Sequence, residues 1–110
     1  MKRIDEFDHI KELAEKIAAA VNPLRIYLFG SFAEGRNNED SDYDFYVVMP
    51  DDDKRNVWDL MTEAQMAIVF SCKRPFDILV NKFSLFEKSK HIVGGVINEV
   101  NKKGVIIYER

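Results

Sequence analysis

The most informative stretch of this sequence spans residues 30–44 and reads GSFAEGRNNEDSDYD. A short run of aromatic and β-branched residues precedes it, so Gly30 and Gly35 are expected to bracket a turn at the end of a strand. Backbone N–H groups in such a turn can converge on an anion. Asp42 and Asp44 then lie two residues apart on a second predicted strand, so both carboxylates project from one face of a sheet.

Acidic side chains so close together indicate a metal site. Two neighbouring carboxylates repel each other unless a cation lies between them. Mg²⁺ is a hard cation that prefers oxygen ligands and also keeps water and substrate phosphate in its shell. A third acid, Asp77, lies inside an apolar predicted strand, where an aspartate is costly unless it is exposed, paired or metal-bound. If that strand pairs beside the second one, three carboxylates around two metal ions suit phosphoryl or nucleotidyl transfer.

Two other interpretations of this stretch fail on specific residues. Residues 30–35 have the glycine spacing of a P-loop, but arginine and asparagine follow where that motif needs Lys and then Ser or Thr. Three alternate aspartates ending at Asp44 mimic a calcium-binding loop, but Phe45 occupies the position that requires glycine. We therefore exclude both a P-loop and a calcium loop.

Apolar periodicity divides the rest of the chain into helices and strands. A first amphipathic helix ends at Asn22, because the residue before a proline avoids helical dihedrals. The aspartates at 51–53 are expected to open a second helix, since carboxylates favour the positive end of the helix dipole. Ser84 is expected to cap a long last helix that ends before Gly104. The predicted helices cover residues 5–21, 51–70 and 84–103, and the predicted strands cover residues 24–29, 42–49, 76–81 and 105–108.

This order of elements predicts a mixed α/β (α+β) fold, with one small mixed sheet covered on one face by helices. The final strand is expected at the sheet edge. No repeat or linker-like tract interrupts the sequence, which predicts a single domain over residues 1–110. The 110 residues suffice for one core, and a hydrophobic content of 46% argues against disorder.

Composition also limits the classes of function. With 16 Lys and Arg against 19 Asp and Glu, the formal net charge is −3, which excludes strong nucleic-acid binding by bulk phosphate neutralisation. The single cysteine, Cys72, cannot form an internal disulfide. No apolar signal-peptide core follows the basic N-terminus, and the apolar runs are too short to span a membrane. We expect a soluble, cytoplasmic protein.

The pattern GSxAxG at residues 30–35, followed by SDxD at residues 41–44, resembles the signature of minimal nucleotidyltransferase (MNT) domains. These domains belong to the DNA polymerase beta-like nucleotidyltransferase superfamily. The leading helix, the aspartate in the third strand and the closing segment also fit, so the resemblance covers nearly the whole chain. It implies a nucleotidyltransferase fold and Mg²⁺-dependent transfer of a nucleoside monophosphate, AMP from ATP, to a hydroxyl of a partner macromolecule.

The resemblance also implies a role for each residue of the motif. Gly30 and Ser31 would hold the β- and γ-phosphates through backbone amides and the hydroxyl. Asp42 and Asp44 would bind both Mg²⁺ ions. Asp77 would bind the catalytic ion and help to deprotonate the acceptor hydroxyl, which attacks the α-phosphorus in line and releases pyrophosphate.

One part of the nucleotide remains without a predicted partner. Phe32 and Glu34 stand where many relatives carry a basic residue. Candidates for the basic contact to the triphosphate are Arg36, Lys73 and Arg74, although a surface cation is the default interpretation of each.

Relatives of this kind are commonly encoded beside HEPN-type ribonuclease toxins and act as antitoxins that modify a toxin tyrosine. The resemblance thus implies an antitoxin enzyme with a HEPN-type toxin as its protein partner. The alternative is a non-catalytic antitoxin that neutralises the toxin by occlusion, through the edge strand at 105–108 and apolar side chains such as Phe83 and Phe86. The intact aspartates favour the enzyme, with protein, RNA and small-molecule acceptors all open.

Four further chemistry-bearing residues are expected to be structural. His9 and His91 are predicted to be solvated helix positions rather than ligands. Cys72 is predicted to be a small inert residue at a helix end. Trp58 is expected to be partly buried.

Overall fold

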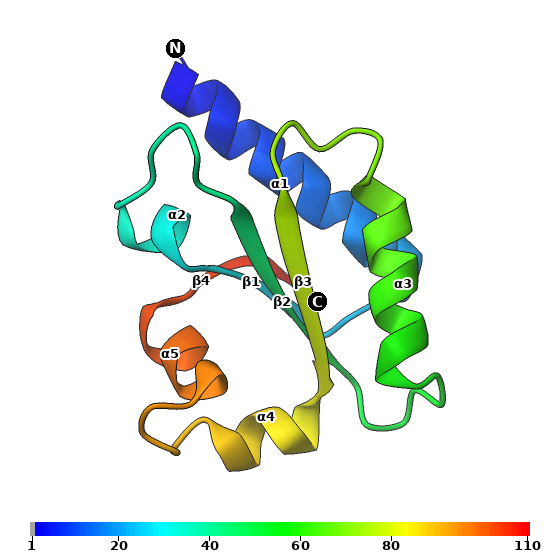
Figure 1. Cartoon of the computed structure of the whole chain (residues 1–110). Helices are drawn as coiled ribbons and strands as arrows, with labels where there is room; N and C mark the ends of the chain where they lie inside the picture. The colour runs from blue at the N-terminus through cyan, green and yellow to red at the C-terminus, as the bar shows by residue number, and fades with distance from the viewer. Residues whose placement is uncertain (1) are drawn as a thin grey trace.

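The computed structural model describes residues 2–110, and the side chains of residues 6–110, as a central sheet with helices around it (Figure 1). The elements are α1 (Lys2–Val21), β1 (Arg25–Phe29), α2 (Ser31–Glu34), β2 (Tyr43–Met49), α3 (Val57–Ile68), β3 (Phe76–Lys82), α4 (Phe83–Ser89), α5 (Val96–Lys103) and β4 (Val105–Glu109). The sheet has four strands in the order β3-β2-β1-β4. β1 is antiparallel to both of its neighbours, whereas β2 and β3 are parallel. The predicted mixed α/β fold is confirmed, and β4 is an edge strand as expected.

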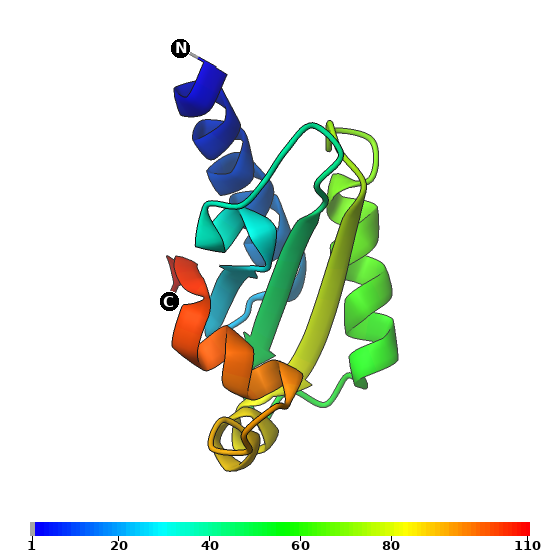
Figure 2. The same cartoon turned by 60° about the vertical axis from the view of Figure 1, so that its left-hand side comes forward.

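Helices pack against both faces of the sheet. α1 and α3 cover one face, where Phe45 and Ile78 are buried. α4 and α5 cover part of the opposite face around Tyr27, Tyr46 and Phe86. Figure 2 shows α5 in front of the strands and α1 behind them. The expectation of one covered face is corrected, because β2 is apolar on both faces beyond its first residues, as a doubly covered strand requires.

The first helix follows the predicted apolar stripe. Its buried side chains recur at steps of three and four residues and include Leu13, Ile17 and Val21. The chain then turns at Asn22, whose φ of 55° lies in the left-handed region. Charged residues occupy the opposite side of this helix, and no helix that the structure describes is long and apolar enough to cross a membrane.

The acidic triplet does not open α3, contrary to the sequence prediction. Asn56 caps this helix by accepting a backbone N–H in its first turn. Asp53 instead binds the guanidinium of Arg55, which holds the pKa of Asp53 at about 2. Asp51 accepts the backbone N–H of Ser84 in α4 at 2.9 Å. These carboxylates do not lie at the N-terminus of α3, because the Arg55 guanidinium and the backbone of α4 offer them direct hydrogen bonds.

The predicted long last helix is two helices, α4 and α5. A turn separates them at Gly94, where φ is 88°, and Gly95 then serves as the N-cap of α5. Two consecutive glycines make helix continuation unfavourable because they lose the most backbone freedom in a helix. Ser84 lies inside α4 rather than capping it. The short helix α2 was not predicted at all.

Two side chains differ in burial from the sequence prediction. His9 is 8% exposed, and its Nε2 accepts the backbone N–H of Lys73 at 3.3 Å, which ties α1 to the segment after α3. Trp58 is 73% exposed on the outer side of α3. His91 is exposed as predicted, but it lies in the turn between α4 and α5 rather than in a helix. Cys72 is partly buried beyond the end of α3.

The second face of the sheet has a core of its own, which a single substitution can test. The ring of Phe86 is fully buried with its centroid 5.5 Å from that of Tyr27 and 5.7 Å from that of Tyr46. Phe86→Ala should lower the free energy of unfolding by about 3–5 kcal/mol in urea denaturation. Phe70→Ala, at a side chain 93% exposed, is the control and should change it by less than about 0.5 kcal/mol. Equal losses would contradict this second core.

Candidate active site

Two acidic side chains lie next to each other on the parallel strands β2 and β3. Asp44 pairs in register with Asp77, and residues paired in register project from the same face of a sheet. This is the face that α4 and α5 cover only in part, and Asp77 and Leu79 remain exposed there. Asp42 is exposed on the segment that leads into β2. The fold thus brings near one another the three acids that the sequence analysis singled out.

The Asp44 carboxyl is partly buried beside like charges. Burial raises its pKa first, the negative charge of Asp77 adds to the effect and that of Asp42 adds less, so that the pKa reaches about 6. A carboxyl that is partly desolvated beside two like charges has a deficit of positive charge around it. A bound cation would relieve that deficit.

Gly30 lies directly against the Asp44 carboxylate. It follows Phe29, which pairs with Asp44 at the end of β1, and it has a φ of 78°. A Cβ atom at this position would collide with Oδ2 of Asp44, so any other residue would displace this carboxylate and strain the backbone. Gly35, with a φ of 73°, ends the short helix that begins at Ser31. The predicted glycine turn therefore adjoins the acidic side chains.

The acidic side chains fit a divalent cation by their chemistry. Carboxylate oxygens are the ligands that Mg²⁺ prefers, and a cation would offset the burial and the like charges that raise the pKa of Asp44. Within the described residues, no three His, Cys, Asp or Glu side chains stand close enough to surround one ion by themselves. A Mg²⁺ ion that keeps water and substrate phosphates in its shell does not need such a cage.

A cleft of about 260 Å³ opens beside Gly30, between the end of β1 and the start of α5. Lys103 is the one basic side chain among the described residues that line it, and its Nζ lies 3.4 Å from Glu99. Sequence reasoning missed Lys103, because no motif marks it. Its place beside the glycine turn arises only from the packing of α5 against β1. The other residues lining the cleft are Phe29, Glu34, Gly94, Gly95, Val96 and Glu99.

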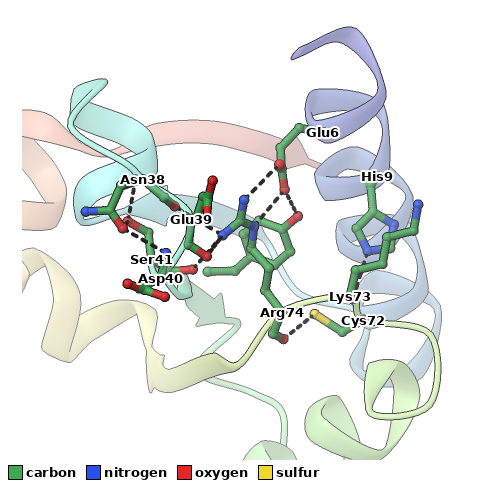
Figure 3. Close-up of polar contacts among 10 residues, drawn as sticks. Glu6, His9, Asn38, Glu39, Asp40, Ser41, Cys72, Lys73 and Arg74 are labelled. Atoms are coloured by element: carbon green, nitrogen blue, oxygen red, sulfur yellow. Dashed lines mark hydrogen bonds and ion pairs between the residues drawn. The ribbon is translucent and has the colours of Figure 1, made fainter. Parts of the chain in front are cut away.

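The three side chains predicted as candidates for a basic contact to the triphosphate lie in three different places. Arg36 pairs with Glu34 at 3.2 Å and so remains near the cleft. Lys73 faces α1, where it lines a shallow hollow with His9. Arg74 is not a surface cation: its side chain is 21% exposed, and its guanidinium contacts α1 and the loop before β2 (Figure 3).

Known proteins resemble this chain in sequence family and in fold. The family described as Polymerase beta, Nucleotidyltransferase matches residues 9–110. None of the curated proteins matches the sequence. Seven chains of solved structures match it. One of them, described as a candidate nucleotidyltransferase from Sulfolobus solfataricus, is 23% identical over 97% of this chain and 83% of its own, with a TM-score of 0.66.

Two further solved structures are toxin-antitoxin proteins. One, determined with AMP-PNP, is 20% identical, and the other, a mutant of MntA-HpeT with two aspartates changed to glutamate, is 16% identical. Each covers 91% of this chain and 73% of its own, with TM-scores of 0.55 and 0.54. These likenesses support the observed fold.

The perturbed Asp44 carboxyl should make the metal-free protein less stable as the pH rises. The carboxyl ionises near 3.8 when unfolded and near 6 when folded, so between these values the folded state binds more protons and the free energy of unfolding falls with pH. Asp44→Asn should therefore stabilise the protein by about 1–2 kcal/mol at about pH 8 in EDTA, with the gain fading toward pH ~4. Asp40→Asn, at an exposed aspartate, is the control in urea denaturation at both pH values. A gain independent of pH would contradict this account.

Proposed function

This chain belongs to the polymerase beta nucleotidyltransferase family, and from this we propose that it transfers AMP from ATP to a hydroxyl of a partner macromolecule with the help of Mg²⁺. The observation that carries the proposal is the pairing of Asp44 with Asp77 directly beside Gly30. Paired carboxylates next to a glycine turn combine a cation site with a place where phosphate can approach the backbone.

Each residue of the site has a part in this proposal. Asp42, Asp44 and Asp77 would hold Mg²⁺, which when bound neutralises the charge that develops on the transferred phosphoryl group. Gly30 lets the nucleotide approach the backbone, and the Ser31 hydroxyl donates to its phosphates. Asp77, which is exposed, would accept the proton of the acceptor hydroxyl. That oxygen then bonds to the α-phosphorus while the bond to pyrophosphate breaks.

We further propose an antitoxin role with a HEPN-type toxin as partner. Two proteins of similar fold are toxin-antitoxin proteins, and the two aspartates changed in one of them have the spacing of Asp42 and Asp44. The edge strand β4 offers a surface for a partner, because Val105 and Ile106 are partly exposed beside unpaired backbone groups. Phe86 does not belong to this surface, contrary to the sequence prediction, because it is fully buried.

Labelled ATP tests the enzymatic proposal. Wild-type protein with Mg²⁺ and a co-purified toxin should transfer label, and Asp42→Asn/Asp44→Asn should lower that rate at least about 100-fold, because the cation loses its ligands. Asp8→Asn/Asp52→Asn removes the same charge at exposed positions and should label normally.

Equal labelling by the two double variants would overturn the proposed site. Survival of cells that express the toxin separates catalysis from occlusion. If Asp42→Asn/Asp44→Asn protects the cells as well as wild type, the protein acts by binding alone, and the proposed enzymatic role is wrong.

Lys103 should contribute to nucleotide affinity, because it lines the cleft beside Gly30. Lys103→Gln should weaken binding of ATP about tenfold in titration calorimetry, the effect of losing one charged contact to phosphate. Lys102→Gln is a matched control, because Lys102 is an exposed neighbour in the same helix that does not line the cleft. Equal affinities of the two variants would remove Lys103 from the nucleotide site.

A further inference from the structure

The guanidinium of Arg74 binds the loop that leads into Asp42. Arg74 lies between α3 and β3, and its Nη1 donates to the backbone carbonyls of Asn38, Glu39 and Ser41 at 3.2, 2.9 and 3.2 Å. Figure 3 shows the guanidinium extending from its own segment toward these carbonyls. One side chain thus contacts most of the backbone just before Asp42.

The opposite side of the same guanidinium is anchored on α1. Its Nε and Nη2 donate to the Glu6 carboxylate at 3.1 and 3.3 Å, and the Tyr43 hydroxyl donates to the same carboxylate. The contact with Arg74 is the largest influence that lowers the pKa of Glu6. The ring of Phe32 lies 5.0 Å from the guanidinium carbon. Ionic, hydrogen-bonding and cation–π contacts therefore fix the position of Arg74 independently of its contacts with the loop.

The loop itself is a small turn with internal hydrogen bonds. Asn38 donates its backbone N–H to Oγ of Ser41, and its own side-chain oxygen accepts the backbone N–H of Asp40, each at 2.8 Å. Within the described part of the chain, the hydrogen bonds that join residues 38–41 to another element are those from Arg74. Without Arg74 the turn loses these hydrogen bonds, so its internal hydrogen bonds open more readily.

Asp42 depends on this attachment more than the other two acids do. Asp44 and Asp77 lie within paired strands, where ladder hydrogen bonds fix their backbone. Asp42 precedes β2 and is exposed. The backbone N–H of Tyr43 fixes the chain on its C-terminal side by donating to the Pro75 carbonyl at 3.1 Å, so the turn at residues 38–41 determines the chain on its N-terminal side. We infer that Arg74 is a positioning residue: by binding the backbone carbonyls of residues 38–41 it sets where the Asp42 carboxylate meets the metal–nucleotide complex. This role rests on the proposed nucleotidyltransferase function.

Lysine cannot replace arginine in this position. The planar guanidinium presents five N–H donors in fixed directions, which here reach a carboxylate on one side and carbonyls on the other. A lysine ammonium has three donors on a single nitrogen and cannot bridge both sides. Arg74→Lys keeps the positive charge while releasing the loop.

The experiment compares Arg74→Lys with Glu6→Gln in the full chain. Glu6→Gln weakens the anchor on α1 but leaves the bonds from Arg74 to the loop carbonyls, so it separates a loss of stability from a loss of positioning. We expect Arg74→Lys to lower kcat about 10–100-fold with KM for ATP within about twofold of wild type, because a displaced ligand affects the chemical step. We expect Glu6→Gln to lower the thermal unfolding midpoint with kcat within about threefold of wild type.

Amide hydrogen exchange of residues 38–42 gives a readout that does not depend on activity. Exchange there should accelerate in Arg74→Lys and change little in Glu6→Gln, whose loop bonds are intact. Equal falls of kcat in both variants would show a structural role only and overturn the inference. A raised KM for ATP with unchanged kcat in Arg74→Lys would also overturn it, in favour of a direct phosphate contact. A wild-type protein that transfers no label would overturn the proposed function and this role with it.

Discussion

The pairing of β2 with β3 in parallel register is the constraint on which the site depends, because it places the carboxylates of Asp44 and Asp77 side by side. Two like charges on one partly desolvated face cost stability, as the raised pKa of Asp44 shows. The opposite face of the same strands supplies the compensation, since Phe45 and Ile78 are buried there under α1 and α3. Alternation along a strand thus lets one stretch of chain stabilise the fold and carry the chemistry. Such local conflicts between charge and stability are expected at functional sites.

One part of the second face of the sheet is covered by helices, and the other part is open to solvent. α4 and α5 pack around Tyr46 and Phe86 and leave the end of the sheet with Asp77 exposed. Gly30 closes the site on the β1 side, where its missing side chain makes room for a carboxylate. α5 forms one wall of the adjoining cleft, with Lys103 at the C-terminal end of this helix. Under the proposed function, an acidic chain would bind a polyphosphate through a metal ion and a local lysine, without a broad basic surface.

The backbone of the three acids is not held equally firmly. The strand ladder determines the backbone of Asp44 and Asp77, but Asp42 lies outside it, and the turn before it is joined to the remaining structure through Arg74. The same network connects Glu6 in α1 with the segment after α3, so the N-terminal helix supports the site as well as the core. The ion pair with Glu6 and the hydrogen bonds to the loop carbonyls together satisfy the partly buried charge of Arg74.

Short windows of sequence determined the elements and the position of the motif. The period of the apolar residues predicted α1 and the strands, and the glycine turn with alternate aspartates indicated the site and its family, because these signals depend on neighbours a few residues apart. Only the tertiary structure decided the partners of polar side chains. Asp53 binds Arg55 instead of opening a helix. Arg74, predicted as a surface cation, binds α1 and the loop before β2. Lys103 likewise reaches the cleft of Gly30 through the packing of α5. A charged group takes the best partner that the folded chain brings within reach, and residues distant in sequence become neighbours only through packing.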